Sequence, residues 1–392
     1  MKILFVVNIL KGIGGIESSL LNLLNTLDSP KYDIYLCVMG NYISDTTQIP
    51  ENVKIIKGNK FIEYACVEYK DLVNNVSFIE KITLILIKII KKLIGYRAIL
   101  LFSLKFMRRE EKYDVAISYS NDMYKDVYSG GCEDYVISCV NANKKIAWIH
   151  NDAREHGLTY KICKEKYSKF DSIVNVSKGC KEIFDSIIPE YKWKSKVVTN
   201  MVSMEDIESK KSEESPYECG FNIVTVARID NQQKRIDRII DSCKILKEFG
   251  ISNFKWTIVG DGPDLHALIQ TADKLDILDV IKFEGRKSNP IPYIEHADLF
   301  VQTSDYEAYS MVLIESLSVE TPCLCTNYES AKDIIMNNKN GLLVEKDPKQ
   351  IAETIINLMQ NREKLTRIKK ECKESSLQLN KEALNLFEKL VK

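Results

Sequence analysis

The sequence has no long run of apolar residues that is free of charged side chains. Its opening stretch MKILFVVNIL is apolar, but Lys11 and Gly12 end it, and the run ITLILI at residues 82–87 is shorter still. A helix that crosses a bilayer needs about 20 apolar residues, so we expect no transmembrane helix and interpret the opening stretch as a buried strand. A signal-peptide pattern is also missing, which favours a cytoplasmic protein.

The 11 cysteines are scattered along the chain and do not show the spacing of metal ligands. Cys323 and Cys325 form the motif CLC in an apparent strand, where alternate residues share one face. This pattern favours two buried thiols over a zinc site. The odd number of cysteines and the expected cytoplasmic location favour reduced thiols.

Net charge is absent as well, because 55 Lys and Arg residues balance 55 Asp and Glu residues. The two halves differ, however: residues 1–200 carry 29 basic and 23 acidic residues, which leaves 26 and 32 for residues 201–392. Residues 78–109 hold eight basic residues and one acidic residue among many apolar ones. Such a segment predicts a helix that lies on an anionic membrane surface. The alternative is a helix packed in its own domain, with lysine heads that reach water.

Strand-like runs alternate with helical patterns along the whole chain, which is typical of α/β proteins with parallel sheets. Residues 15–27 predict a helix whose apolar side chains share one face: Ile16, Leu20, Leu23, Leu24 and Leu27. The expected strands are residues 2–7, 33–39, 114–119, 144–150, 172–177 and 196–200, and then 221–227, 254–260, 280–285, 298–303, 322–326 and 341–345.

These two series of strands predict two Rossmann-like doubly wound domains that face a central cleft. We place the N-terminal domain at residues 1–202 and a polar linker without periodicity at residues 203–220. The C-terminal domain follows at residues 221–375, and an amphipathic helix at residues 376–392 is expected to pack back toward the N-terminal domain. Ligands of such sheets bind at the carboxyl ends of the strands.

A glycine-rich turn lies between the first strand and the first helix, in VVNILKGIGGIESSL. Gly12, Gly14 and Gly15 would let a ligand approach the backbone closely, and the start of a helix favours an anion. The turn does not complete the dinucleotide fingerprint G-x-G-x-x-G, because Glu17 occupies the place of the third glycine. An ordinary tight turn remains the alternative.

Two cations follow the first strand of the C-terminal domain, in VARIDNQQKRIDRII. Arg228 and Lys234 suit a diphosphate, to which they can donate charge-assisted hydrogen bonds. Arg235 and Arg238 are expected on the outer face of the following helix as solvated charges. The loop of Gly285, Arg286 and Lys287, at the end of a later strand, could hold a nucleobase through its backbone, or could be an ordinary turn.

The stretch TSDYEAYSMVLIES places two carboxylates around a helix start. Ser310 is a good N-cap residue, so the helix should begin at Met311. Glu307 then precedes the helix and Glu315 lies in its second turn. The free N–H groups of the first turn lie between them and suit phosphates. One carboxylate can accept hydrogen bonds from ribose hydroxyls and the other from a sugar, although two unrelated surface glutamates would explain this stretch alone.

The order of these motifs resembles retaining GT-B glycosyltransferases, specifically glycosyltransferase family 4 (group 1). The glycine-rich loop, Arg228 and Lys234, GDGP, FEG, the two glutamates and GLLV follow one another over nearly the whole chain. The resemblance is strongest over residues 221–345.

The resemblance implies an acceptor-binding N-terminal domain and a C-terminal domain that binds a nucleotide-sugar. Arg228 and Lys234 would hold the donor diphosphate and stabilise the leaving group, Glu307 would contact the transferred sugar, and Glu315 would bind ribose. The remaining residues implied in donor binding are Gly14, Gly15, Gly285, Arg286, Ser310, Met311 and Val312.

Such enzymes need no metal, which agrees with a sequence that contains no Asp-x-Asp, and we expect no cofactor. His150 matches a family histidine near the donor sugar and the acceptor; a buried structural histidine is the alternative. Ala308 and Ser330 stand where relatives usually carry glycine, and Asp333 stands where they often carry glutamate. These departures leave the donor sugar open.

The sequence therefore predicts transfer of a sugar from a nucleotide-sugar, with a UDP-sugar favoured over GDP-mannose. The acceptor would be a glycan or a polyprenyl-diphosphate-linked glycan of a bacterial capsule or O-antigen. We expect a peripheral protein at the inner face of the plasma membrane and no nucleic-acid partner. The alternatives are a non-catalytic GT-B scaffold that binds glycan or a partner, and an NAD-dependent dehydrogenase that uses the glycine-rich turn.

Overall fold

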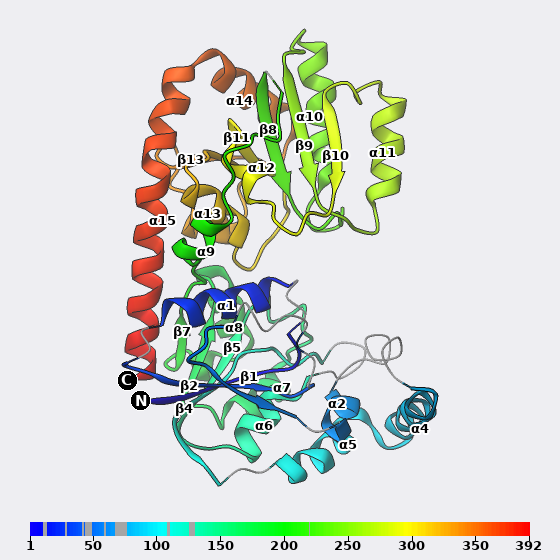
Figure 1. Cartoon of the computed structure of the whole chain (residues 1–392), viewed down its shortest axis with the longest axis vertical. Coiled ribbons are helices and arrows are strands. Elements are labelled where there is room, and N and C mark those ends of the chain that lie inside the picture. Colours follow the sequence, from blue (N-terminus) through cyan, green and yellow to red (C-terminus); the bar gives the residue numbers. More distant parts are fainter. Residues whose placement is uncertain are drawn as a thin grey trace. The chain divides into compact units, whose positions relative to one another are not determined.

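The computed structural model divides the chain into two compact units (Figure 1). The first unit comprises Met1–Asn200 and Leu384–Lys392, and the second comprises Met201–Ala383. The structure describes residues 1–10, 14–27, 30–40, 43, 49–58, 60–66, 77–107, 110–124, 130–218 and 220–392. Gly12 of the glycine-rich turn and the last two residues of the basic segment 78–109 lie outside the described residues.

The first unit is built on a seven-stranded parallel sheet in the order β3-β2-β1-β4-β5-β6-β7. Its strands are β1 (Lys2–Val7), β2 (Asp33–Val38), β3 (Lys54–Lys57), β4 (Lys112–Ser118), β5 (Asn141–Ile149), β6 (Ser172–Asn175) and β7 (Ser195–Val197). Its helices are α1 (Gly15–Thr26), α2 (Lys60–Cys66), α4 (Phe78–Ile94), α5 (Tyr96–Leu104), η2 (Lys105–Met107), α6 (Cys132–Ser138), α7 (Tyr160–Tyr167), α8 (Lys178–Ile187) and η3 (Pro189–Tyr191).

The second unit has a six-stranded parallel sheet in the order β10-β9-β8-β11-β12-β13. Its strands are β8 (Phe221–Val226), β9 (Phe254–Val259), β10 (Ile281–Gly285), β11 (Leu299–Gln302), β12 (Cys323–Thr326) and β13 (Gly341–Val344). Its helices are α9 (Met204–Ser209), α10 (Ile236–Glu248), α11 (Leu265–Lys274), α12 (Ile291–Glu295), α13 (Met311–Ser318), η4 (Glu329–Asp333), α14 (Pro348–Gln360) and α15 (Arg362–Val391). Figure 1 shows α10 and α11 beside the strands β8, β9 and β10.

Both sheets reverse their strand order at a central strand. β1 lies between β2 and β4, and β8 lies between β9 and β11. Chain connections leave these points in opposite directions, and α/β sheets bind ligands at such points, at the carboxyl ends of their strands. β1 is buried on both faces, since Ile3, Leu4, Phe5 and Val6 are all inaccessible to solvent, as expected for a central parallel strand.

The structure differs from the expected linker and from the expected terminal helix. The linker at residues 203–220 contains helix α9, whose first turn is capped by the Ser203 side chain. Helix α15 begins at Arg362, well before the expected start at residue 376, and extends for 30 residues. Its last residues belong to the first unit, where the Phe387 ring lies 6.3 Å from Phe5 and 6.2 Å from Trp148.

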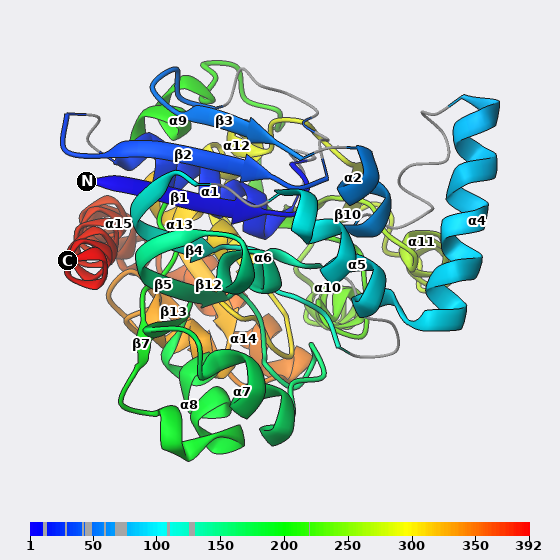
Figure 2. The same cartoon turned by 90° about the horizontal axis from the view of Figure 1, so that it is seen from below.

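The cysteine side chains and the apolar helices bear on two expectations from the sequence, buried thiols and a helix on a membrane surface. The nine cysteines whose side chains the structure describes are buried thiols, including Cys323 and Cys325 in β12. Within those residues, no helix combines the length and the apolar character needed to cross a membrane. Figures 1 and 2 place α4 at the margin of the first unit, beside α5 and α2.

Candidate functional site: carboxyl-end clusters of the two sheets

The carboxyl end of β1 leads into helix α1 at Gly14 and Gly15. Gly14 occupies the N-cap position, and no side chain caps this helix start. A Cβ atom on Gly15 would meet no atom within 4 Å, and one on Gly14 would only touch the Glu17 side chain at 3.9 Å. The described structure therefore leaves room for a ligand at these two glycines.

His150 follows β5, two strands away from β1 in the first sheet. Its ring lies 4.5 Å from the Tyr119 ring and is stacked with Trp148 at 6.0 Å. The residue is 4% exposed, and its ring faces the Tyr119 backbone, with which it makes a weak hydrogen bond. Burial lowers the pKa of His150 to about 3, so the ring is neutral at physiological pH. Its backbone N–H donates to Asn121 at 3.0 Å.

Tyr119 joins this histidine to helix α1, because its hydroxyl lies 2.8 Å from the Ser19 hydroxyl. The structure therefore brings His150 and the start of α1 to the same edge of the first sheet, as the sequence predicts from their positions after strands. Its burial also fits the alternative of a buried structural histidine, so the role of His150 stays a prediction.

Lys234 and Glu307 meet in the second unit. The Lys234 Nζ atom lies 2.5 Å from Glu307 Oε1, and the two side chains are 19% and 9% exposed. Three neutral donors contact the same carboxylate: Gln233 at 3.1 Å, Ser304 at 2.7 Å and Gln302 at 3.3 Å. Glu307 is thus fixed by a cation and three side-chain hydrogen bonds.

Arg228 follows β8 and is held far less firmly. Its guanidinium pairs with Asp230, but the side chain is 65% exposed, and exposed ion pairs are worth at most about 1 kcal/mol. Arg228 can therefore leave this carboxylate for an anionic ligand at low cost.

The expectation that Arg238 is a solvated charge on the outer face of α10 is wrong. Arg238 is 6% exposed and donates to the Thr303 carbonyl at 2.9 Å and to Asp305 at 2.6 Å. Arg235 is half-buried, adopts a left-handed backbone with φ of 53°, and pairs with Asp237 and Asp305. The two arginines fasten the loop before Glu307 to the start of α10.

Helix α13 begins at Met311 after Ser310, as the sequence predicts. The Ser310 hydroxyl makes no capping bond to the first turn; it accepts a hydrogen bond from Gln302 at 3.0 Å instead. The first-turn N–H groups of Met311 and Val312 consequently lack a side-chain cap and can donate to an anion.

Glu315 lies on the second turn of α13 and is partly exposed. Burial raises the pKa of its carboxyl to about 7. Within the described residues no hydrogen bond or ion pair of this carboxylate is present, in contrast to Glu307. Glu315 is therefore available to accept hydrogen bonds from ligand hydroxyls.

Gly285 and Arg286 end β10 at the same edge of the second sheet. Gly285 has a φ of 68°, and a Cβ atom there would meet nothing within 4 Å. Its carbonyl accepts from the Gly260 N–H at 2.9 Å. Arg286 is exposed, whereas its neighbour Lys287 pairs with Glu284 at 2.8 Å.

The GDGP turn supports this edge through close backbone packing. A Cβ atom on Gly260 would lie 1.8 Å from the Ala227 carbonyl oxygen, and one on Gly262 would lie 2.2 Å from that of Ile229. The Ile229 N–H also donates to the Asp261 carbonyl at 3.0 Å. Because these two glycines have no side chain, the GDGP turn packs directly against the backbone that follows β8. The spacing of the glycines in the sequence does not by itself reveal this packing.

Sequence reasoning missed the polar side chains that hold Glu307, namely Gln233, Gln302 and Ser304. Gln302 carried one signal that could have found it, since it is a glutamine at the carboxyl end of a buried strand. It is 4% exposed. Ser330, flagged only as a departure from the family, donates to the Glu307 carbonyl at 2.7 Å.

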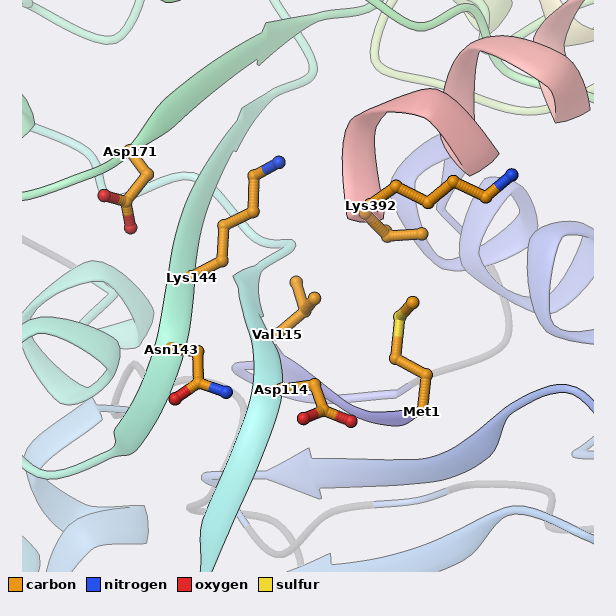
Figure 3. A pocket seen from close by; sticks show the side chains of 8 residues that line it. Met1, Asp114, Val115, Asn143, Lys144, Asp171 and Lys392 are labelled. Carbon is orange, nitrogen blue, oxygen red and sulfur yellow. The ribbon is translucent and has the colours of Figure 1, made fainter.

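A separate cavity of about 570 Å³ lies in the first unit (Figure 3). Asp114, Lys144 and Asp171 are among the residues that line it, beside Met1. These residues lie at the amino ends of their strands, away from His150. The two carboxylates already accept backbone hydrogen bonds, Asp114 from Lys2 at 2.8 Å and Asp171 from Lys145 at 2.7 Å. The cavity is therefore not part of the carboxyl-end clusters.

Comparison with known proteins finds a family resemblance in the second unit. Residues 206–375 match the family model of glycosyl transferases group 1. The chain is 25% identical over 232 residues to an uncharacterized glycosyltransferase of Methanocaldococcus jannaschii, covering 56% of this chain and 57% of that protein. Both the matched family and this relative carry the name glycosyltransferase.

A second relative has a more specific name. The N-acetylgalactosamine-N,N'-diacetylbacillosaminyl-diphospho-undecaprenol 4-alpha-N-acetylgalactosaminyltransferase of Campylobacter jejuni is 30% identical over 185 residues, which is 46% of this chain and 48% of that protein. The chain therefore matches about half the length of these curated relatives.

Among solved structures, Anabaena Alr3699/HepE in complex with UDP matches with a TM-score of 0.68 at 15% identity, covering 99% of this chain and 100% of that chain. This likeness confirms the predicted fold: two parallel-sheet, Rossmann-like domains of the GT-B architecture.

Proposed function

We propose that the chain is a retaining, metal-independent glycosyltransferase of family 4 that extends a bacterial cell-surface polysaccharide. The observation that carries this proposal is the Lys234–Glu307 pair beside the start of helix α13. It combines a cation and free N–H groups, which suit a diphosphate, with a firmly held carboxylate, which suits a sugar. The pair lies within the part of the chain that matches the group 1 family model.

In the proposed reaction, an acceptor oxygen bonds to the anomeric carbon while the bond from that carbon to the donor phosphate breaks. Arg228, Lys234 and the first-turn N–H groups of α13 stabilise the charge that develops on the leaving diphosphate. The acceptor proton passes to a phosphate oxygen on the same face, so no separate side-chain base is required. Glu307 orients the transferred sugar.

The remaining residues would bind other parts of the donor. Glu315 accepts from the ribose hydroxyls, Gly285 and Arg286 flank the nucleobase, and the loop at Gly14 and Gly15 approaches the phosphates. His150 acts as a neutral hydrogen-bonding group toward the sugar and the acceptor, because burial keeps its pKa low.

We favour a UDP-sugar as the donor and a lipid-linked glycan as the acceptor. The UDP complex of the Anabaena structure supports UDP as the nucleotide of the donor. The undecaprenol-linked substrate in the name of the Campylobacter relative supports a lipid-linked acceptor. GDP-mannose is the alternative donor, since Ser330 and Ala308 alter the loop near Glu307.

The enzyme would work at the inner face of the plasma membrane, and helix α4 supports this location. One side of α4 exposes nine large apolar side chains, each 44–77% exposed: Phe78, Ile79, Ile82, Ile85, Leu86, Ile89, Ile90, Leu93 and Ile94. We call this side the apolar face of α4. On a helix these positions cover about half of the circumference, and monomeric soluble proteins rarely expose so large an apolar patch.

The basic residues of α4 fit an anionic surface. Lys81, Lys88 and Lys92 follow one another at helical spacing along one border of the apolar face. Lys91, in contrast, is 6% exposed and donates to the Tyr64 carbonyl at 2.7 Å. The helix thus packs on its own unit through a narrow side that carries Leu84, Ile87 and Lys91, and presents its apolar face outward.

Vesicle sedimentation tests this location. Replacing Leu86, Ile89 and Leu93 by serine should reduce binding to vesicles that contain phosphatidylglycerol on the order of tenfold or more, with unchanged melting because these side chains are exposed. Replacing Lys81, Lys88 and Lys92 by glutamine should weaken the same binding and reduce its salt dependence. Leu278→Ser, at a residue 44% exposed in the second unit, is the matched control. Equal binding by all variants would reject the location.

A thermal-shift screen of UDP-, GDP-, ADP- and TDP-sugars tests the function, because a bound ligand raises the melting temperature. We expect stabilisation by UDP-sugars and release of UDP in the presence of EDTA. Binding without turnover would favour the non-catalytic scaffold, and stabilisation by NAD alone would favour the dehydrogenase.

A further inference from the structure

Gln302 is a buried polar side chain at the end of β11 that the proposed reaction does not use. It is 4% exposed, and its amide is satisfied on both sides. The Oε1 atom accepts from the Tyr328 hydroxyl at 2.6 Å. The Nε2 atom donates to the Ser310 hydroxyl at 3.0 Å and to Glu307 Oε1 at 3.3 Å. Tyr328 thereby fixes which side of the amide faces the other two residues.

The contact with Ser310 changes the start of helix α13. A serine at the N-cap position ordinarily accepts a hydrogen bond from the second or third N–H of its helix. Ser310 has the extended backbone of an N-cap residue, with φ of −81° and ψ of 106°, yet it makes no such bond. Other caps of this chain do: the Ser177 hydroxyl accepts from Cys180 at 3.1 Å, and Ser203 accepts from Asp206 at 3.2 Å. The difference at α13 is the Gln302 amide, which together with the Tyr328 hydroxyl holds the Ser310 hydroxyl toward the strand.

The same amide nitrogen helps to fix the sugar-facing carboxylate. Glu307 Oε1 receives Lys234, Ser304 and Gln302 together. Gln302 therefore lies between the two groups that the proposed function assigns to different parts of the donor, the helix start and the carboxylate.

We infer that Gln302 is a positioning residue of the donor site, which keeps the Ser310 hydroxyl off the first turn of α13 so that its N–H groups bind the donor diphosphate. The inference rests on the proposed function. If Gln302 is removed, the Ser310 hydroxyl turns to cap the helix and competes with the phosphates for the same N–H groups.

Calorimetry with UDP and with inorganic pyrophosphate tests the inference. Gln302→Leu should lower the affinity for both ligands about three- to tenfold, the loss expected when a serine hydroxyl caps the helix start in competition with the phosphates. The double variant Gln302→Leu/Ser310→Ala should recover most of that loss, since alanine cannot cap. Uridine, which has no phosphate, should bind all variants alike in saturation-transfer NMR. A general collapse of the site would instead weaken uridine and would not be rescued by alanine.

Tyr328→Phe provides a second variant that keeps the volume of the buried ring. Without the Tyr328 hydroxyl, the Gln302 Oε1 atom keeps only the Cys325 thiol at 3.8 Å, and Ser310 loses one of its two contacts. A smaller loss of pyrophosphate affinity is therefore expected, again recovered by Ser310→Ala. This pair decides the question if Gln302→Leu fails to fold.

The outcomes separate the two levels of the argument. Tight nucleotide binding by the wild type without rescue by Ser310→Ala would overturn the role of Gln302 alone. Pyrophosphate binding without any nucleotide binding would overturn the proposed function, while the rescue experiment would still decide the role of Gln302. A wild-type chain that binds neither ligand would overturn both.

Discussion

Lys234→Ala separates the chemistry of the donor site from the stability of its domain. Lys234 is 19% exposed and pairs with the 9% exposed Glu307, and a hydrogen bond to a charged group contributes about 1.5–3 kcal/mol. Gln233, Ser304 and Gln302 still donate to Glu307 after the substitution. The second unit should therefore fold, with a melting temperature lowered by about 3–12 °C.

Transfer should respond far more strongly than stability. Loss of one preorganised group that stabilises developing charge costs on the order of 10²–10³ in rate, and the diphosphate would lose a cation altogether. We expect UDP release to fall by that factor, measured at a temperature where the variant is fully folded.

Lys244→Ala is the matched control for Lys234→Ala. Lys244 pairs with Glu248 at 3.7 Å, and both side chains are at least half exposed, 50% and 61%. This variant should change stability by less than about 0.5 kcal/mol and leave transfer unchanged. Transfer by Lys234→Ala that stays above a tenth of the wild-type rate would refute the assignment of Lys234 to the diphosphate.

Three further predictions concern stability and pH. Gly262→Ala should destabilise the second unit by about 3 kcal/mol or more in urea unfolding, because its Cβ would lie 2.2 Å from the Ile229 oxygen. Gly285→Ala should cost only about 1 kcal/mol, because a Cβ there meets open space and only the positive φ of 68° is unfavourable. Equal losses of stability in the two variants would contradict this packing. Burial raises the pKa of Glu315 to about 7 from 4.5. Its contribution to the stability of the folded state should therefore be lost as the pH rises from about 4.5 to 7. The Glu315→Gln variant should consequently be more stable than the wild type by about 1–3 kcal/mol at pH 8 and equally stable at pH 4. Lys166→Met should cost about 3–5 kcal/mol, since Lys166 is 2% exposed and lies 2.9 Å from both Asp122 and Asp134; a loss below 1 kcal/mol would show that these carboxylates do not need the cation.

Strand positions were predictable because most strands of both sheets, such as β1, β2 and β8, are buried runs of apolar residues. The 12 expected strands all appear in the structure, with bounds shifted by a few residues. β3 escaped prediction because only Ile56 of its four residues is buried. Helix α9 escaped for a similar reason, since its single buried residue is Ile207.

The candidate site was predictable only in part. Residue type and place after a strand pointed to Lys234, Glu307 and the start of α13. The ion pairs Lys234–Glu307 and Arg238–Asp305 join residues about 70 positions apart, so no local pattern contains them. The sequence also does not show which charged or titratable side chains are buried: Arg238 is 6% exposed and His150 is 4% exposed.

Product formation tests the central claim most directly. The purified chain would be incubated in EDTA with UDP-sugars and a polyprenyl-diphosphate-linked glycan, and the product examined by mass spectrometry and proton NMR. The account predicts that the acceptor gains one sugar with the anomeric configuration of the donor, with release of one UDP per transfer. A folded chain that transfers no sugar from any nucleotide-sugar, or transfers it with inverted configuration, would contradict the account.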